Sequence, residues 1–113
     1  MPRLLFSFFL FSFSLFAQAQ DIPEIEKFGK NPGKLRMFIH VPKELPEGNV
    51  PLVVVLHGCN QDAHGMMRLS GWNKLADENG FIIAYPEQKG TNNANRCFNW
   101  FYGKDTEMDK GEV

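Results

Sequence analysis

The sequence predicts an α/β fold in which a β-hairpin precedes a strand, a helix and a second strand of a mainly parallel sheet. Two short apolar runs, residues 52–56 and 81–86, lack alternation of apolar and polar side chains, which is typical of strands covered on both faces. Between them, residues 70–79 show the spacing of an amphipathic helix. A strand–helix–strand order of this kind implies parallel strands joined by a right-handed crossover.

Residues 1–19 have the pattern of a secretory signal. Arg3 precedes an apolar stretch over residues 4–16, and Ala17-Gln18-Ala19 supplies the small residues of a cleavage site. The apolar stretch is shorter than the ~20 residues that a membrane span needs. We therefore expect cleavage near Ala19–Gln20 and export of the chain, rather than an uncleaved, stable membrane anchor. Residues 20–113 are then expected to form one domain.

Residues 21–41 predict the hairpin. The segments "IPEIEKF" and "KLRMFIHV" flank a cluster of turn-forming residues at positions 29–33. Period-two alternation divides the second arm into two faces. The face that carries His40 is expected to be the more exposed. The first face holds Leu35, Met37, Ile39 and Val41, and the second holds Arg36, Phe38 and His40.

The two strands and the helix follow a loop that contains three prolines, Pro42, Pro46 and Pro51. Residues 52–56 are expected to form a central, parallel strand. Because Gly65 and Gly71 interrupt the next segment, we expect a loop or a short turn before the helix. The expected helix has Ser70 as its N-cap, ends at Asn79-Gly80, and turns three side chains inward. The inward side chains are those of Trp72, Leu75 and Ala76, and the solvated ones are those of Lys74, Asp77 and Glu78.

Charge and cysteine content narrow the functional class. The formal net charge is −1 and no basic patch is present, which excludes a nucleic-acid partner. In an exported chain the only two cysteines, Cys59 and Cys97, favour a disulfide over two buried free thiols, although their spacing does not prove proximity. Such a bridge would close a loop of about 39 residues and stabilise the fold by roughly 4 kcal/mol.

The sequence offers no nucleophile of a familiar kind. No G-x-S-x-G motif is present, and the only serine after the signal, Ser70, reads as a helix cap. A cysteine nucleophile would require a free thiolate, which a disulfide is not. His57, Cys59, Asp62 and His64 could be considered for zinc, but they lack paired ligand spacing. We therefore expect neither a metal nor an organic cofactor.

The turn "HGCNQ", residues 57–61, is the strongest candidate for chemistry. It follows the apolar strand at the end where ligands bind in parallel sheets. Gly58 would let the backbone bend sharply, so that the next N–H groups point into a cleft. Acyl transfer needs such donors for the developing oxyanion. We expect Cys59 N–H to be one donor and His57 to support the turn through hydrogen bonds, without acting as the base.

Three further residues are candidates for substrate binding. Asn60 and Gln61 belong to the same turn, and Trp100 lies in an aromatic segment, residues 97–102. A long structured loop is often functional. The aromatic segment has two open interpretations, which are hydrophobic packing under a loop and a wall of the substrate site.

Three blocks of this sequence resemble the poly(3-hydroxybutyrate) depolymerase-like esterases, which are α/β-hydrolases related to feruloyl and acetylxylan esterases. The blocks are "PLVVVLHGCNQ", "GWNKLADENGFIIAYPEQ" and "NRCFNWF", and the likeness covers residues 35–113. It implies a secreted carboxylic-ester hydrolase that works through a serine acyl-enzyme on a polyester or an acylated polysaccharide. It also implies that Cys59 supplies an oxyanion-hole N–H and bridges to Cys97, with the Trp100 region near the substrate-side loops.

The resemblance also shows a departure. Members of the family continue with a G-x-S-x-G serine, an acidic residue and a histidine, and none of these follows here. We expect the sequence to be the N-terminal part of such a domain. Alone it would be inactive, because the serine, the acid and the base are missing, and poorly folded, because its sheet would keep an unpaired edge.

Two other functional classes remain open. One is a secreted, non-catalytic module that binds carbohydrate or polymer through Trp100 and Tyr102, and the other is a periplasmic thiol or metal protein that uses Cys59 and Cys97. The sequence fixes neither the ester nor the oligomeric state.

Overall fold

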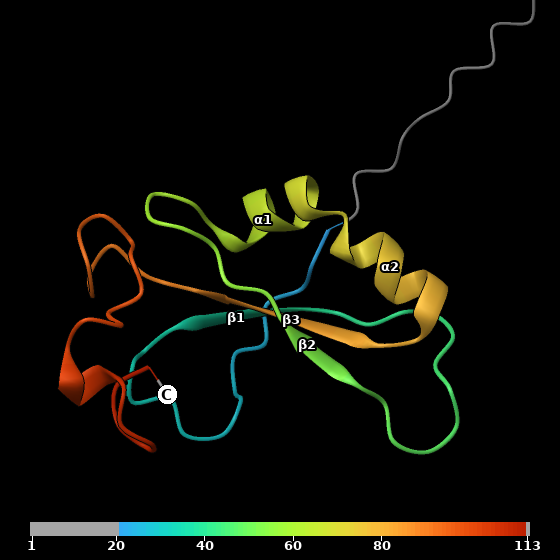
Figure 1. The fold of residues 1–113 in the computed structure, drawn as a ribbon, viewed down its shortest axis with the longest axis horizontal. Helices are drawn as coiled ribbons and strands as arrows, with labels where there is room; N and C mark the ends of the chain where they lie inside the picture. Colours follow the sequence, from blue (N-terminus) through green and yellow to red (C-terminus); the bar gives the residue numbers. More distant parts are fainter. Residues whose placement is uncertain (1–20, 113) are drawn as a thin grey trace, which may run out of the picture.

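The computed structural model describes residues 21–112, and the predicted signal, residues 1–19, lies outside them. The described part is a small α/β domain (Figure 1). Its sheet has three strands, and two helices and one 3-10 turn accompany it. The strands are β1 (Arg36–His40), β2 (Leu52–Val54) and β3 (Ile82–Glu87). The helical elements are α1 (Ala63–Ser70), α2 (Trp72–Asn79) and η1 (Gly103–Asp105).

The strand order is β1-β3-β2, so that β3 is central among the described strands. β2 and β3 are parallel, with Leu52 opposite Ile82, and the helices lie between them in the chain. This confirms the predicted strand–helix–strand unit. β1 pairs antiparallel with β3, so the described sheet is mixed rather than mainly parallel. The antiparallel pair places Phe38 opposite Tyr85.

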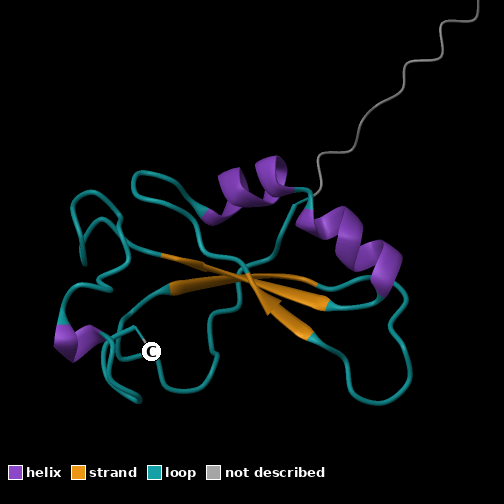
Figure 2. Ribbon diagram, viewed as in Figure 1, coloured by secondary structure: helices purple, strands orange, loops and turns teal. Residues whose placement is uncertain are grey.

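Both helices cover the same face of the sheet (Figure 2). Alternate residues of β3, Ile83 and Tyr85, are fully buried on this face. They join the small side chains of α1 and α2 and one aromatic ring of β1 in a single core cluster. The members of that cluster are Ile22, Phe38, Val55, Ala63, Met67, Ala76, Ile83 and Tyr85. Within residues 21–112, neither helix is long enough and apolar enough to cross a membrane.

The predicted hairpin is reduced to a single bridge. Glu24 and Phe38 form an isolated antiparallel bridge, supported by hydrogen bonds from Ile25 N–H to Met37 O (2.8 Å) and from Ile39 N–H to Pro23 O (3.1 Å). Residues 22–28 therefore do not form a strand. Pro23 contributes to this because it has no N–H for a continuous ladder.

The prediction that Phe38 belongs to the more exposed face of its strand was wrong. Phe38 is 3% exposed and lies in the core. Antiparallel pairing places it opposite Tyr85, on the face that the helices cover. The other face of β1, which carries Met37 and Ile39, is half-buried.

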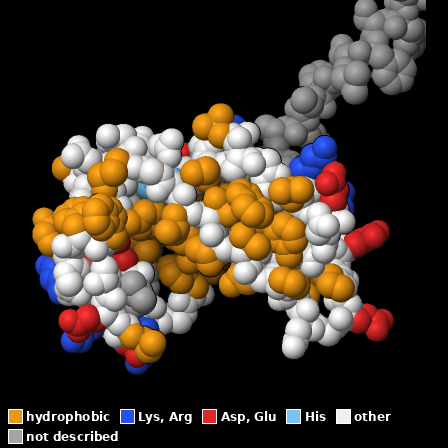
Figure 3. Space-filling view, in the orientation of Figure 1, with side chains coloured by type: hydrophobic (Ala, Val, Ile, Leu, Met, Phe, Trp, Pro, Cys, Tyr) orange, Lys and Arg blue, Asp and Glu red, His pale blue; other side chains and the backbone are white. Residues whose placement is uncertain are grey.

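The prediction that residues 52–56 form a central strand covered on both faces was also wrong for the described sheet. β2 is at its edge, and Leu52, Val54 and Leu56 are 61%, 55% and 53% exposed. Figure 3 shows hydrophobic side chains gathered in a band across the middle of one side of the molecule. An apolar run indicates that its side chains require burial, but it does not say what buries them.

The helical region differs from the expectation at its start. Residues 63–70 form α1 instead of a loop, because Asp62 caps the helix through a bond from Gly65 N–H to Asp62 Oδ1 (2.6 Å). Gly71, at φ 72°, separates α1 from α2. Ser70 is therefore the last residue of α1 rather than the N-cap of a helix. The predicted end at Gly80 is confirmed, since Gly80 adopts φ 69° and donates to Ala76 O (2.8 Å).

The inward stripe of α2 was predicted only in part. Ala76 is fully buried and Trp72 half-buried, but Leu75 is exposed. Asn73 is buried in its place, and its Oδ1 accepts a hydrogen bond from Tyr85 Oη (2.7 Å). Burial raises the pKa of the Tyr85 hydroxyl, which a hydrogen bond with Ser70 partly offsets, so Tyr85 remains a donor at neutral pH. The predicted solvated residues, Lys74, Asp77 and Glu78, are exposed.

Candidate functional site

His57 follows β2 and is buried between two chain segments. Its Nδ1 lies 2.7 Å from Gly58 O, and Gln88 N–H donates to its Nε2 (3.0 Å). Because Nε2 accepts, the ring proton is on Nδ1 and is donated to Gly58 O. The Phe98 ring packs against His57 at a centroid distance of 4.8 Å. Both ring nitrogens are thus engaged in holding the turn.

The five residues after His57, residues 58–62, form the segment that we call the donor loop. Gly58 N–H donates to Gln61 Oε1 (2.7 Å), and Gln61 N–H donates to Gly58 O (3.2 Å). Asn60 N–H donates to Asn95 O (2.7 Å). Among the hydrogen bonds of the described residues, the exposed Cys59 contributes no N–H donor. Three of the five N–H groups of the loop therefore have acceptors among the described residues, and those of Cys59 and Asp62 have none. Cys59 is the exposed one of these two, whereas Asp62 is half-buried.

Gly58 was predicted to allow a sharp bend of the backbone, but the structure gives it a different role. The left-handed residue of the loop is Asn60, at φ 58°, which asparagine tolerates better than most residues. Gly58 is not in that region. A Cβ at Gly58 would lie 2.9 Å from Gln61 Oε1, so glycine allows the close approach of the Gln61 side chain.

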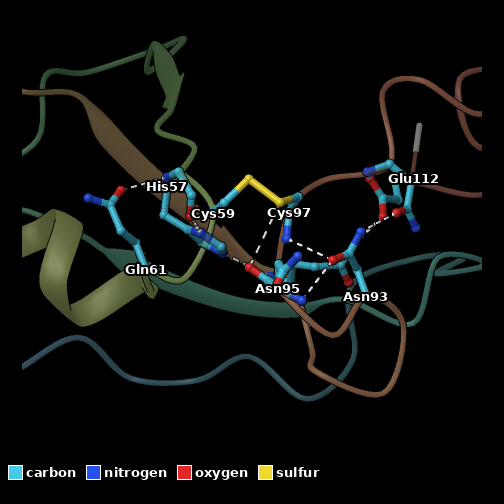
Figure 4. Close-up of a disulfide and its surroundings, with 10 residues drawn as sticks. His57, Cys59, Gln61, Asn93, Asn95, Cys97 and Glu112 are labelled. Carbon is cyan, nitrogen blue, oxygen red and sulfur yellow. Dashed lines mark hydrogen bonds between the residues drawn. A yellow bond between two sulfur atoms is a disulfide. The ribbon is translucent and has the colours of Figure 1, made fainter.

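Cys59 and Cys97 form a disulfide, with their Cα atoms 4.2 Å apart. The preference for a bridge over two free thiols is thus confirmed. Figure 4 shows the bridge between the turn that carries His57 and Gln61 and the segment that carries Asn93. The bridge ties the donor loop to the long loop after β3, and it leaves Cys59 without a thiolate for zinc or for nucleophilic attack.

The remaining candidate residues have separate surroundings. Trp100 is 76% exposed and contacts Phe101 edge-to-face at 5.5 Å. It also lines a cavity of about 260 Å³ together with Leu56 and Phe98. His64 Nε2 lies 3.1 Å from Asp21 Oδ1, and this contact involves no residue of the donor loop. Within residues 21–112 no three possible metal-ligating side chains come together.

Two residues at the end of β3 contact the segments on either side of the donor loop and were not singled out from the sequence: Gln88 binds His57, and Glu87 binds Ala63. Glu87 is 7% exposed; its Oε2 accepts from Ala63 N–H (2.9 Å) and its Oε1 from Arg36 Nη1 (2.8 Å). Arg36 also binds Glu24 through two further hydrogen bonds (2.9 and 2.7 Å). These bonds lower the pKa of Glu24 and raise that of Arg36. The sequence signal was the position of "PEQ" at the same end of the sheet as "HGCNQ".

The family model described as esterase PHB depolymerase matches residues 36–112, which include the sheet, the donor loop and both cysteines. The chain belongs to this esterase family. The predicted resemblance is thereby confirmed.

Relatives in the esterase PHB depolymerase family agree with this assignment. A poly(3-hydroxyalkanoate) depolymerase C from Paucimonas lemoignei is 46% identical over 92 residues, which are 81% of this chain and 22% of the relative. A feruloyl esterase B from Thermothelomyces thermophilus is 38% identical over 60% of this chain and 23% of the relative. The solved acetyl xylan esterase from Aspergillus awamori aligns with a TM-score of 0.54 at 33% identity, covering 59% of this chain and 24% of that one. The chain thus spans about a quarter or less of the length of these esterases.

Proposed function

We propose that this chain supplies the oxyanion-binding part of a secreted serine carboxylic-ester hydrolase. The observation that carries the proposal is the hydrogen bonding of the N–H groups in the donor loop. Of the N–H groups of residues 58–62, those of Cys59 and Asp62 have no acceptor among the described residues, and of these two residues only Cys59 is exposed. The loop is anchored around this exposed group by His57, by the disulfide and by Asn95. A fixed and unoccupied donor of this kind is what electrostatic stabilisation of an oxyanion requires.

In the proposed mechanism, a serine attacks the carbonyl carbon of the ester, and the carbonyl oxygen becomes an oxyanion. Cys59 N–H donates to that oxygen while the alcohol departs and the acyl-enzyme forms. Water then attacks the acyl-enzyme, and the same donor stabilises the second oxyanion before the acid and the free serine are released. His57 is excluded as the base in this scheme because both of its ring nitrogens hold the turn.

We place the nucleophile, the acid and the base outside these residues. No G-x-S-x-G motif is present, and Ser70 lies at the end of α1, where its Oγ accepts from Trp72 N–H (3.4 Å). Residues 20–113 are proposed to be the N-terminal part of an α/β-hydrolase domain. The free edge of β2 supports this because its backbone offers a further strand a place to pair. The exposed side chains of Leu52 and Val54 support it as well, because they leave apolar surface on one face of the sheet for further elements to cover.

The substrate is proposed to be an ester in a polyester or an acylated polysaccharide. The names of the similar proteins, a poly(3-hydroxyalkanoate) depolymerase and feruloyl and acetylxylan esterases, support that range of substrates. Export is proposed from the signal pattern over residues 1–19, and the Cys59–Cys97 disulfide supports it, since disulfides persist in oxidising compartments.

The alternative of a non-catalytic polymer-binding module has one observation in its favour. Trp100, Phe101 and Tyr102 are all exposed, as rings that stack on a polymer would be. Family membership and the strand–helix–strand order favour the esterase, because such modules are usually β-sandwiches.

Reading the nucleotide sequence downstream of Val113 tests the proposal. We expect a G-x-S-x-G motif, in any of the three frames, within about sixty codons, since the family's serine lies on a strand-to-helix turn after this part of the fold. A long open downstream sequence without such a motif in any frame would contradict the proposal.

A further inference from the structure

Two adjacent residues at the end of β3 hold the donor loop at both of its ends. Gln88 N–H donates to Nε2 of His57, the residue that precedes the loop (3.0 Å). Glu87 Oε2 accepts from N–H of Ala63, the residue that follows the loop (2.9 Å). Both bonds are buried. The end of β3 therefore fixes the distance that residues 58–62 must span.

The Glu87 carboxylate links three elements. One oxygen binds the first residue of α1, and the other binds Arg36 Nη1 of β1 (2.8 Å). A carboxylate that is 7% exposed needs an opposite charge, and Arg36 provides it. Arg36 is in turn oriented by Glu24, to which it donates from Nε and Nη2.

A carboxylate suits this position because both partners are donors. Each oxygen accepts one of them, so the Arg36 and Ala63 bonds exist together. A glutamine would present an NH2 group to one of these donors and would lose that bond. Glu87→Gln therefore either removes the bond from Ala63 N–H or leaves it to a neutral amide oxygen that no longer pairs with Arg36, with almost no change in side-chain size.

We propose that Glu87 is a positioning residue for the donor loop and, through it, for Cys59 N–H. The proposal rests on the proposed function, because the position of this N–H matters to an esterase reaction. Glu87 holds the backbone of Ala63 through a hydrogen bond. Ala63 directly follows Asp62, which is the last residue of the loop and the N-cap of α1, so the bond also restrains the end of the loop. Of the loop's other anchors, the disulfide holds its second residue, Cys59, and the bond to Asn95 holds its middle residue, Asn60. Without the bond from Ala63 to Glu87, the later part of the loop is held by fewer contacts.

The test compares Glu87→Gln with Glu24→Gln by amide hydrogen exchange, using NMR on protein from the complete coding sequence. Both changes remove a carboxylate from Arg36, but only Glu87 contacts the loop's end. We expect Glu87→Gln to speed exchange at Asn60 and Ala63 about tenfold, as loss of a charge-assisted hydrogen bond implies. Exchange at Ile83, in the core of β3, should change much less, and Glu24→Gln should leave the loop unchanged.

Equal acceleration at Ile83 and Asn60 would overturn the proposal, because it would show a general loss of stability. Equal effects of the two glutamine variants on the loop would also overturn it. If Glu87→Gln does not fold, Ala63→Pro removes the same bond from the other side, since proline fits the first position of a helix but has no N–H. Faster exchange at Asn60 in that variant supports the proposal, and unchanged exchange overturns it.

This readout is independent of ester turnover. A change at Asn60 without a downstream serine would support the positioning role and count against the esterase proposal. If the protein hydrolyses esters but Glu87→Gln leaves the exchange of the loop amides unchanged, the esterase proposal is supported and the positioning role of Glu87 is contradicted.

Discussion

Replacing Cys59 and Cys97 together with alanine is expected to lower the free energy of unfolding by roughly 4 kcal/mol, because the bridge closes a loop of about 39 residues in the unfolded chain. The loop includes both helices and β3, so the bridge restricts most of the described core. Urea denaturation of the oxidised parent and of the double variant, both made from the complete coding sequence, measures the difference. If the destabilisation is larger still, the double variant will show an incomplete cooperative unfolding transition in urea.

A reductant provides the matched control for this prediction. Dithiothreitol should destabilise the parent about as much as the double substitution does, and it should leave the double variant unchanged. A loss of less than about 1 kcal/mol would contradict a substantial stabilising role for the bridge.

Removing the N–H of residue 59 is expected to lower kcat for ester hydrolysis by about 10²–10³-fold, which is the usual effect of losing one oxyanion donor. Proline is the natural substitution that deletes a backbone N–H. Cys59→Pro should be made with Cys97→Ala, in protein from the complete coding sequence. KM should change little, because the donor acts on the oxyanion rather than on the bound ester.

The matched control for the proline variant is Cys59→Ala with Cys97→Ala. Both proteins lack the disulfide, so their difference isolates the N–H group. Positive φ at Cys59 would forbid proline, but the left-handed residues of the chain do not include Cys59. Equal kcat values for the alanine and proline proteins would show that this N–H is not an oxyanion donor.

The parallel strand–helix–strand unit could be predicted because its two strands are continuous apolar runs, which are typical of strands that are buried in a sheet. Residues 52–56 and 81–86 were correctly paired as parallel strands on that basis. The exposure of Leu52 and Val54 could not be predicted, because a run does not reveal what packs on it. The burial of Phe38 also depends on its pairing opposite Tyr85, 47 positions later in the chain, and alternation alone could not choose between two faces that both carry apolar residues.

The candidate site divides in the same way. The position of "HGCNQ" at the end of a parallel strand followed from local sequence, and so did the preference for a Cys59–Cys97 bridge. The importance of Glu87 did not, because it depends on contacts with Ala63 and Arg36, which are distant in the sequence. Gly58 was identified for its backbone freedom, whereas in the structure it lies outside the left-handed region and leaves room for the Gln61 side chain.

In the proposed function, this chain carries an oxyanion donor but no nucleophile. Assaying purified residues 20–113 with p-nitrophenyl acetate, beside a Ser70→Ala variant, tests that claim most directly. We predict no turnover above buffer for either protein. Turnover above buffer that persists in Ser70→Ala would contradict the account, because it would require a nucleophile that these residues are held to lack.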